Sequence, residues 1–205
     1  MTLFVDSPMS MKKHVLLTGE PGVGKTTICK MLIEHFKNEE NISGFYTEEV
    51  RGTDSKSGRV GFDVVSIDDL TLRFPLARLS SMCPQLHGPR VSKYTIDLEK
   101  FEASTVPLLK KSFADTSLCV IDEIGKMELF SPRFKSLVID LFDRTSVNLL
   151  CTVPSYQIKF VDDLKRRDDV ELFHVTKCNR NYLKSELIQR IEAYLCQTKE
   201  VMKKQ

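Results

Sequence analysis

The sequence has 205 residues, of which 41% are hydrophobic and 28% charged, proportions that are ordinary for a folded globular protein. Thirty basic and twenty-eight acidic residues give a net charge of +2, so charge offers no reason to expect nucleic acid as a partner. No stretch approaches the ~18 apolar residues of a membrane span, so no membrane partner is expected, and the N-terminus lacks the features of a signal peptide. We expect a flexible extension at 1–11, a single domain over 12–198 and a frayed tail at 199–205.

Cysteines and histidines are spread along the chain without the spacing of a metal site or a disulfide framework. Cys119 and Cys151 fall within apolar runs, where a free thiol packs as a small hydrophobic group. We therefore expect reduced thiols and an intracellular, cytoplasmic protein. We also expect a monomer. The basic run at 165–167 is followed at once by two aspartates, and we interpret it as a solvated helix end.

Residues 19–26 match the pattern Gly-x-x-x-x-Gly-Lys-Thr of a phosphate-binding loop. An apolar run at 15–17 precedes the match, and apolar residues spaced by four follow it to about residue 38. The motif thus lies between a strand and a helix, the context that it requires and that disfavours a glycine-rich turn without a ligand. The residues expected to contact the nucleotide are Gly19, Glu20, Pro21, Gly22, Val23, Gly24, Lys25, Thr26 and Thr27.

Two side chains of this loop have distinct expected roles. Lys25 is expected to reach the β- and γ-phosphate oxygens and to take part in catalysis. The Thr26 hydroxyl is expected to ligate the Mg²⁺ ion that bridges these phosphates. The motif therefore predicts nucleoside triphosphates as ligands and Mg²⁺ as cofactor.

The next segment has the pattern of β-structure. Runs at 44–51 and 59–65 flank a turn-rich stretch and predict an antiparallel hairpin. A further strand is possible at 70–76, before a loop over 77–92 of about a dozen residues, a length typical of a lid or a mobile segment. Arg78 and Arg90 flank this loop, and either could approach a triphosphate, although an exposed arginine is the commoner case.

A strand at 93–96 and a helix follow this loop. Asp97 is the expected N-cap of the helix, and Pro107 is expected to kink or split it. The apolar residues of the helix expected to face the core are Leu98, Phe101, Leu108 and Leu109.

The segment 118–125, Leu-Cys-Val-Ile-Asp-Glu-Ile-Gly, predicts a buried parallel strand that ends in carboxylates. Ligands bind at this end of the strands in open α/β sheets, so Asp122 is expected to hold Mg²⁺ through water. Glu123 is the candidate to orient or deprotonate the attacking water, and a strand-end cap is its alternative role. Lys126 could offset charge there. The residues expected to contact the nucleotide here are Asp122, Glu123, Ile124 and Gly125, the last through its N–H.

The remaining elements continue an alternation of helices and strands. Ser131 and Pro132 predict the start of a helix that ends near residue 144, and strands follow at 147–153 and 170–175. Thr152 could sense the γ-phosphate from the sheet edge or could be a strand hydroxyl with a local partner. The last helix is expected at 182–196. Together the elements predict an α/β P-loop NTPase fold, with three layers, a mainly parallel sheet and an added antiparallel hairpin.

Four motifs together resemble one family. They are Gly-Phe-Tyr-Thr-Glu-Glu-Val-Arg at 44–51, Val-Gly-Phe-Asp-Val-Val at 60–65, Asp-Glu-Ile-Gly-Lys-Met-Glu-Leu-Phe at 122–130 and Val-Thr-Lys-x-Asn-Arg at 175–180. With the phosphate loop, they make the chain from about 12 to 190 resemble the cancer-related nucleoside triphosphatases, which also occur in thermophilic bacteria and archaea. The resemblance implies slow, Mg²⁺-dependent hydrolysis of nucleoside triphosphates with little base selectivity.

The tetrapeptide Thr-Lys-Cys-Asn at 176–179 suggests a physical basis for broad base tolerance. Guanine-specific GTPases read the base with a similar tetrapeptide that ends in aspartate, whereas the amide of Asn179 can both donate and accept hydrogen bonds. We hypothesise that Asn179, followed by Arg180, lies near the base. An unchanged preference between GTP and ATP in Asn179→Asp would contradict this hypothesis.

Hydrolysis by a water that Glu123 orients is the leading interpretation. A small-molecule or nucleoside kinase of similar fold is an alternative, because the loop at 77–92 could close over an acceptor. A nucleotide-dependent switch is another, since 122–125 also fits the Asp-x-x-Gly pattern of GTPase switch loops. The balanced charge disfavours an ATPase stimulated by RNA or DNA.

Overall fold

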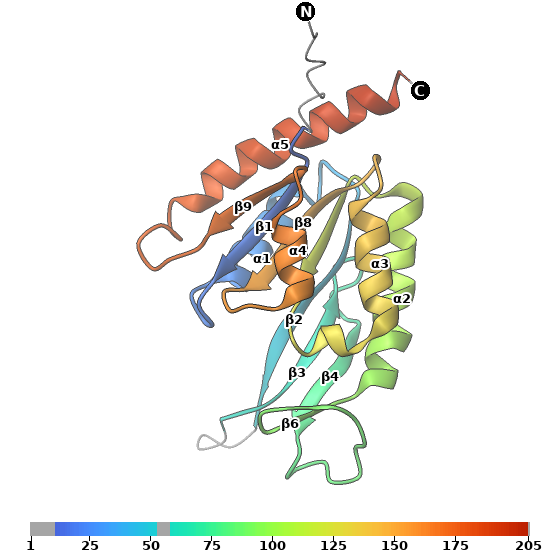
Figure 1. Cartoon of the computed structure of the whole chain (residues 1–205), viewed down its shortest axis with the longest axis vertical. Coiled ribbons are helices and arrows are strands. Elements are labelled where there is room, and N and C mark those ends of the chain that lie inside the picture. Colours follow the sequence, from blue (N-terminus) through green and yellow to red (C-terminus); the bar gives the residue numbers. More distant parts are fainter. Residues whose placement is uncertain (1–10, 53–57, 205) are drawn as a thin grey trace, which may run out of the picture.

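The computed structural model describes residues 11–52 and 58–204. In these residues a nine-stranded sheet lies between two layers of helices (Figure 1). The strands are β1 (His14–Gly19), β2 (Ile42–Arg51), β3 (Arg59–Ser66), β4 (Arg73–Leu79), β5 (Arg90–Val91), β6 (Tyr94–Ile96), β7 (Leu118–Asp122), β8 (Asn148–Pro154) and β9 (Val170–His174). The helices are α1 (Lys25–Phe36), α2 (Leu98–Asp115), α3 (Pro132–Phe142), α4 (Lys159–Lys165) and α5 (Leu183–Met202), with a 3₁₀ turn, η1 (Glu128–Phe130).

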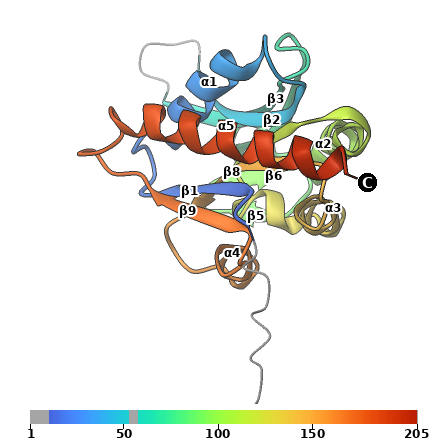
Figure 2. The same cartoon turned by 90° about the horizontal axis from the view of Figure 1, so that it is seen from above.

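The parallel part of the sheet consists of β2, β7, β8, β1 and β9, in that order. Helices α1 and α5 cover one face and α2, α3 and α4 cover the other (Figure 2). Because both faces are covered, alternate residues of a strand enter different cores: Val120 packs with α1 and α5, and Cys119 packs with α2 and α3. This explains the continuous apolar runs that predicted the central strands.

The other part of the sheet is antiparallel and begins at β2. Strand β2 pairs in parallel with β7 and antiparallel with β3, and the sheet then continues through β4, β6 and β5. The predicted hairpin is therefore confirmed, and the P-loop fold class with it, but further antiparallel strands extend the sheet. Residues 1–10 of the extension predicted at 1–11 and the turn residues 53–57 lie outside the described residues.

Several helix starts agree with the sequence. Asp97 caps α2, with its Oδ1 accepting from the N–H of Lys100 at 3.1 Å. Ser131 caps α3, with its Oγ accepting from the N–H of Phe134 at 2.9 Å, and Pro132 is the first helical residue.

None of the described helices is long and apolar enough to cross a bilayer.

The clearest differences from expectation concern β4, α2 and α5. The strand predicted at 70–76 begins later, at Arg73, because the side chain of Asp69 accepts from the N–H of Thr71 at 2.9 Å and forms a local turn. Helix α2 runs through Pro107 without a break, since its packing against the sheet outweighs one missing N–H donor.

Helix α5 is the third difference, because it continues to Met202, beyond the predicted end at residue 196. Thr198 is buried near that end, and the ammonium of Lys199 lies 2.6 Å from Oε1 of Glu40. Tertiary contacts thus hold a helix end whose sequence shows weak periodicity.

Candidate active site

The phosphate loop predicted from the sequence connects β1 to α1. Gly22 and Gly24 have φ of 73° and 117°, in the left-handed region that favours glycine. A Cβ on Gly19 would lie 2.4 Å from the carbonyl oxygen of Val175, so the chain after β9 approaches too closely for any side chain. Gly24 is the residue before α1, and the first N–H groups of that helix therefore lie at the loop. The loop has the geometry of an anion-binding nest.

Lys25, the first residue of α1, is buried and folds over this loop. Its Nζ donates to the carbonyl oxygens of Gly19 at 2.8 Å and Glu20 at 3.3 Å. A phosphate oxygen that enters the loop can replace these neutral acceptors with a charged and stronger one. Val23 differs from the other loop residues, because its side chain packs into the core beneath the loop.

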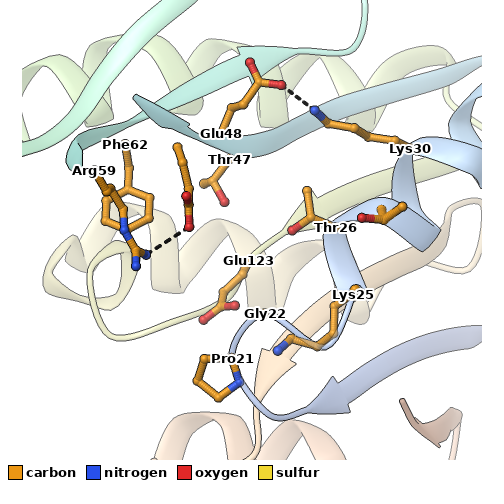
Figure 3. Close-up of a pocket in the computed structure, with 13 residues that line it drawn as sticks. Pro21, Gly22, Lys25, Thr26, Lys30, Thr47, Glu48, Arg59, Phe62 and Glu123 are labelled. Atoms are coloured by element: carbon orange, nitrogen blue, oxygen red, sulfur yellow. Dashed lines mark hydrogen bonds and ion pairs between the residues drawn. The ribbon is translucent and has the colours of Figure 1, made fainter. Parts of the chain in front are cut away.

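A cleft of about 440 Å³ opens above the loop (Figure 3). Segments that are distant in sequence form its walls. The loop and the start of α1 contribute Pro21, Gly22, Gly24, Lys25, Thr26 and Thr27. The hairpin of β2 and β3 contributes Thr47, Glu48, Glu49, Arg59 and Phe62, and the end of β7 contributes Glu123. The sequence predicted that the phosphate loop and Glu123 would lie in the same site. It did not predict that the hairpin of β2 and β3 would form a wall of that site.

Asp122 is the last residue of β7 and is only 1% exposed. Its Oδ1 accepts a hydrogen bond from the hydroxyl of Thr152. Of the two positions considered for Thr152, the structure therefore has the strand hydroxyl with a local partner. Burial raises the pKa of Asp122, while the hydroxyls of Thr152 and Thr26 and the ammonium of Lys25 act in the opposite direction. The carboxylate thus lies close to the first turn of α1, as the spatial arrangement of the two motifs requires.

The surroundings of Asp122 fit a magnesium ion. Its Oδ2 is buried and has no hydrogen-bond partner in the described part of the chain, and a metal ion or its bound water would supply one. Among residues 11–52 and 58–204, no group of three or more His, Cys, Asp or Glu side chains forms a metal cage. Mg²⁺ commonly binds through one carboxylate, waters and substrate phosphates, so Asp122 and Thr26 suffice on the protein side.

Glu123 projects into the cleft beside the loop, and it is less buried than its neighbour (Figure 3). Burial raises the pKa of Glu123, the ammonium of Lys25 lowers it, and the carboxylate of Asp122 raises it further. Its carboxylate lies in the cleft beside the phosphate loop, and a raised pKa makes a carboxylate a better proton acceptor.

Glu128 is an acidic residue of this region that the sequence patterns did not single out. It is 4% exposed, and its Oε2 accepts from the N–H of Gly125 at 3.2 Å. The N–H expected to contact the γ-phosphate therefore has a partner within the protein. Burial, with the charge of Glu123 as a smaller cause, raises the pKa of Glu128 to about 8.

A stability measurement tests whether Glu128 keeps its proton in the folded protein near neutral pH. Between the ordinary carboxyl pKa and about 8, the unfolded chain has released a proton that folded Glu128 still holds, so this group lowers stability as the pH rises. Glu128→Gln keeps an oxygen for the Gly125 N–H and removes the effect. We expect its Tm relative to wild type to increase from pH 5 to pH 8.5 by roughly 5–10 °C.

The control for this measurement is Glu99→Gln, since Glu99 is exposed on α2. Its Tm difference from wild type should stay constant over the same pH range. A difference for Glu128→Gln that is equally independent of pH would contradict a neutral, buried Glu128.

A second cavity of about 180 Å³ adjoins the cleft, and the two share Thr47, Phe62 and Glu123. Its other walls are Leu76, Val91, Lys126, Met127, Glu128 and Tyr156. Lys126 therefore lies on the far side of Glu123 from the phosphate loop. Ile124, by contrast, is buried in the core, and its N–H donates to the carbonyl oxygen of Thr152 at 2.9 Å.

The loop after β9 lies on another side of the phosphate loop. The side-chain amide of Asn179 accepts from the N–H of Thr176 at 2.8 Å and donates to the carbonyl oxygen of His174 at 2.7 Å. Asn179 thus organises its own loop, and it does not line the cleft. Arg180 donates to the carbonyl oxygen of Val23 at 3.2 Å, which ties this loop to the phosphate loop.

The two arginines considered from the sequence lie away from the cleft. Arg78 is part of β4 and binds Asp63 at 2.6 Å, and Arg90 is exposed on β5. Arg59 does line the cleft, at the start of the second strand of the hairpin. Its place in the wall of the cleft depends on the register between β2 and β3, which no local motif specifies.

A phosphate loop and a strand-end aspartate at one rim of a parallel sheet define a P-loop nucleotide-binding protein. Comparison with known proteins gives the same class. A family model described as NTPase matches residues 14–188. The cancer-related nucleoside-triphosphatase homolog of Bos taurus is 40% identical over 192 residues, which cover 89% of this chain and 98% of that protein.

Two solved structures are similar as well. The crystal structure of THEP1 from Aquifex aeolicus has a TM-score of 0.75 at 28% identity and covers 87% of this chain and 99% of that one. The solution structure of a human cancer-related nucleoside triphosphatase has a TM-score of 0.72 at 38% identity, with coverage of 88% and 98%. The chain belongs to the NTPase family.

Proposed function

We propose that the protein hydrolyses nucleoside triphosphates to the diphosphate and phosphate. One observation carries the proposal: Lys25 and Thr26 of the phosphate loop share one rim of the sheet with Asp122 and Glu123 of β7. The names of the relatives, which are nucleoside-triphosphatases, support the same reaction.

In the proposed reaction, a water held by Glu123 attacks the γ-phosphorus in line with the bond to the diphosphate. The water oxygen forms a bond to phosphorus, its proton passes to the carboxylate of Glu123, and the bond to the β–γ bridging oxygen breaks. Lys25 and the loop amides bind the charge that develops on the departing diphosphate. A bound Mg²⁺, held through Thr26 and Asp122, would neutralise charge on the β- and γ-phosphates.

Broad base tolerance and slow turnover are part of the proposal. Position 179 is an asparagine, so no carboxylate is available there to select guanine, and its amide is engaged by backbone groups of its own loop. The acceptors of Lys25 must be exchanged when phosphate binds, and this is consistent with slow turnover. The intracellular location and the monomeric state also stay proposals, the former supported by buried free thiols at Cys29, Cys119 and Cys151.

Steady-state phosphate release tests the proposal with ATP, GTP, CTP and UTP, each with Mg²⁺ and with excess EDTA. We expect release from all four with rates within about tenfold, the effect of ~1.4 kcal/mol, and none with EDTA. Release from GTP alone would contradict broad tolerance. Absence of release from any nucleotide would contradict hydrolysis.

The second cavity favours one other candidate function, a small-molecule or nucleoside kinase. It lies beyond Glu123 and is several times larger than one water needs, and part of its wall is apolar. An acceptor hydroxyl could bind there and replace water as nucleophile. The assay distinguishes the two reactions, because a kinase supplied with nucleosides or sugars forms more ADP than free phosphate, whereas a hydrolase forms equal amounts.

A further inference from the structure

Arg59 is an arginine in the wall of the nucleotide cleft with no role in the reaction described so far. It begins β3 and lines the cleft with Lys25, Thr26 and Glu123. Figure 3 shows its guanidinium over the ring of Phe62, with Glu123 between it and the phosphate loop. The distance from the guanidinium carbon to the ring centroid is 5.1 Å, so the ring supports the side chain from one side.

Arg59 forms an ion pair with Glu49, and a phosphate group can readily replace this carboxylate. Its NH1 lies 3.1 Å from Oε1 of Glu49, and the side chains are 44% and 41% exposed. Exposed ion pairs of this kind are weak. Arg51 binds the other oxygen of Glu49 at 3.2 Å, so Glu49 keeps a cationic partner when Arg59 turns away. The guanidinium can therefore leave Glu49 without stranding its charge.

The hairpin that carries Arg59 lies at the end of the cleft next to Asp122, the carboxylate that we propose binds the metal. In the sheet register Tyr46 of β2 is opposite Asp122, and Thr47, the next residue, contacts the Asp122 carboxylate through its backbone. Glu49 is paired with Phe62 two positions farther along β2. Arg59 thus follows the metal-binding carboxylate along the sheet, on the side of the cleft that Glu123 occupies. The γ-phosphate and its metal belong at this end.

We propose that Arg59 leaves Glu49 when a triphosphate binds and contacts the γ-phosphate, where it stabilises the charge of the transition state. The inference rests on the proposed hydrolysis and names the arginine that acts in it. Guanidinium matches phosphate with paired donors in one plane, and an arginine at the transferred phosphoryl group accelerates other P-loop enzymes strongly. The hairpin supplies this group from within the chain, so the protein needs no partner for it.

The test compares Arg59→Ala with Arg73→Ala. Arg73 is a matched control: it is 47% exposed, forms an ion pair with Glu48 of β2, the strand that also carries Glu49, and is not among the residues that line the cleft. We expect kcat for ATP to fall on the order of 10²-fold in Arg59→Ala and less than about threefold in Arg73→Ala. Arg59→Lys, which keeps the charge without the planar fork, should recover only part of the loss.

Binding measurements distinguish a contact that Arg59 makes only in the transition state from a contact that it makes whenever a nucleotide is bound. In Arg59→Ala, affinity for Mg²⁺–ADP should stay within about twofold of wild type, and affinity for Mg²⁺–ADP with aluminium fluoride should fall at least tenfold. A loss of ADP affinity equal to the loss of ADP–aluminium fluoride affinity would place Arg59 on the diphosphate or nucleoside and overturn the proposal. Equal activity of Arg59→Ala and Arg73→Ala would overturn it too, and a wild type that releases no phosphate would instead overturn the proposed hydrolysis.

Discussion

Lys25→Ala is expected to abolish phosphate release, with a loss of at least about 10³-fold in kcat/KM. The ammonium of Lys25 lies at the centre of the phosphate loop, bound to the carbonyl oxygens of Gly19 and Glu20. Alanine removes the charge that we propose binds the β- and γ-phosphates in the ground state and in the transition state. Nucleotide affinity should therefore fall together with turnover, as titration calorimetry with ADP and a phosphate-release assay would measure.

Lys37→Ala provides the control for this substitution, because Lys37 is exposed at the end of the same helix. It makes the same change in net charge and should leave both measurements within about twofold of wild type. A Lys25→Ala protein that melts as wild type does and still hydrolyses ATP at more than a tenth of the normal rate would remove Lys25 from the mechanism.

Glu123→Gln is expected to bind nucleotide normally and to hydrolyse it about 10²–10⁴-fold more slowly. The amide has nearly the size and shape of the carboxylate, so it preserves the packing around β7 but cannot take a proton from water. Single-turnover hydrolysis of bound ATP measures this step, and fluorescence titration with a labelled ADP measures affinity.

Two outcomes decide the assignment of Glu123. Glu99→Gln, an isosteric change at an exposed site on α2, should behave as wild type in both assays. Full activity in Glu123→Gln would show that another group handles the proton, and a large loss of ADP affinity would show that Glu123 has a binding role instead.

The central part of the fold and the phosphate loop were predictable because their signals are local. The glycines at 19, 22 and 24, followed by a lysine and a threonine, specify a loop whose N–H groups converge regardless of the rest of the chain. A buried parallel strand requires a continuous apolar run, and the run before Asp122 predicted both β7 and the end at which its carboxylate lies. The N-caps Asp97 and Ser131 are local signals of the same kind.

The features that the sequence left open concern packing. Of the two outcomes expected at Pro107, a kink or a split, the split does not occur, because Phe101 and Leu109 anchor α2 in the core on both sides of the proline. Arg78 and Arg90, for which contact with the triphosphate was one possibility and an ordinary arginine position the commoner case, are not among the residues that line the cleft. Glu128 gave no sequence signal, because only burial distinguishes it from an ordinary solvated glutamate.

By itself the sequence determined that a phosphate nest follows one buried strand and that carboxylates follow another. Parallel strands bring such ends to a common rim, so the pairing of Thr26 with Asp122 was implicit in the two motifs. Only the tertiary structure decided what forms the opposite wall of the cleft. The register between β2 and β3 places Arg59 there, and that register follows from which residues of the two strands pack into the core, which is settled only when the sheet is assembled.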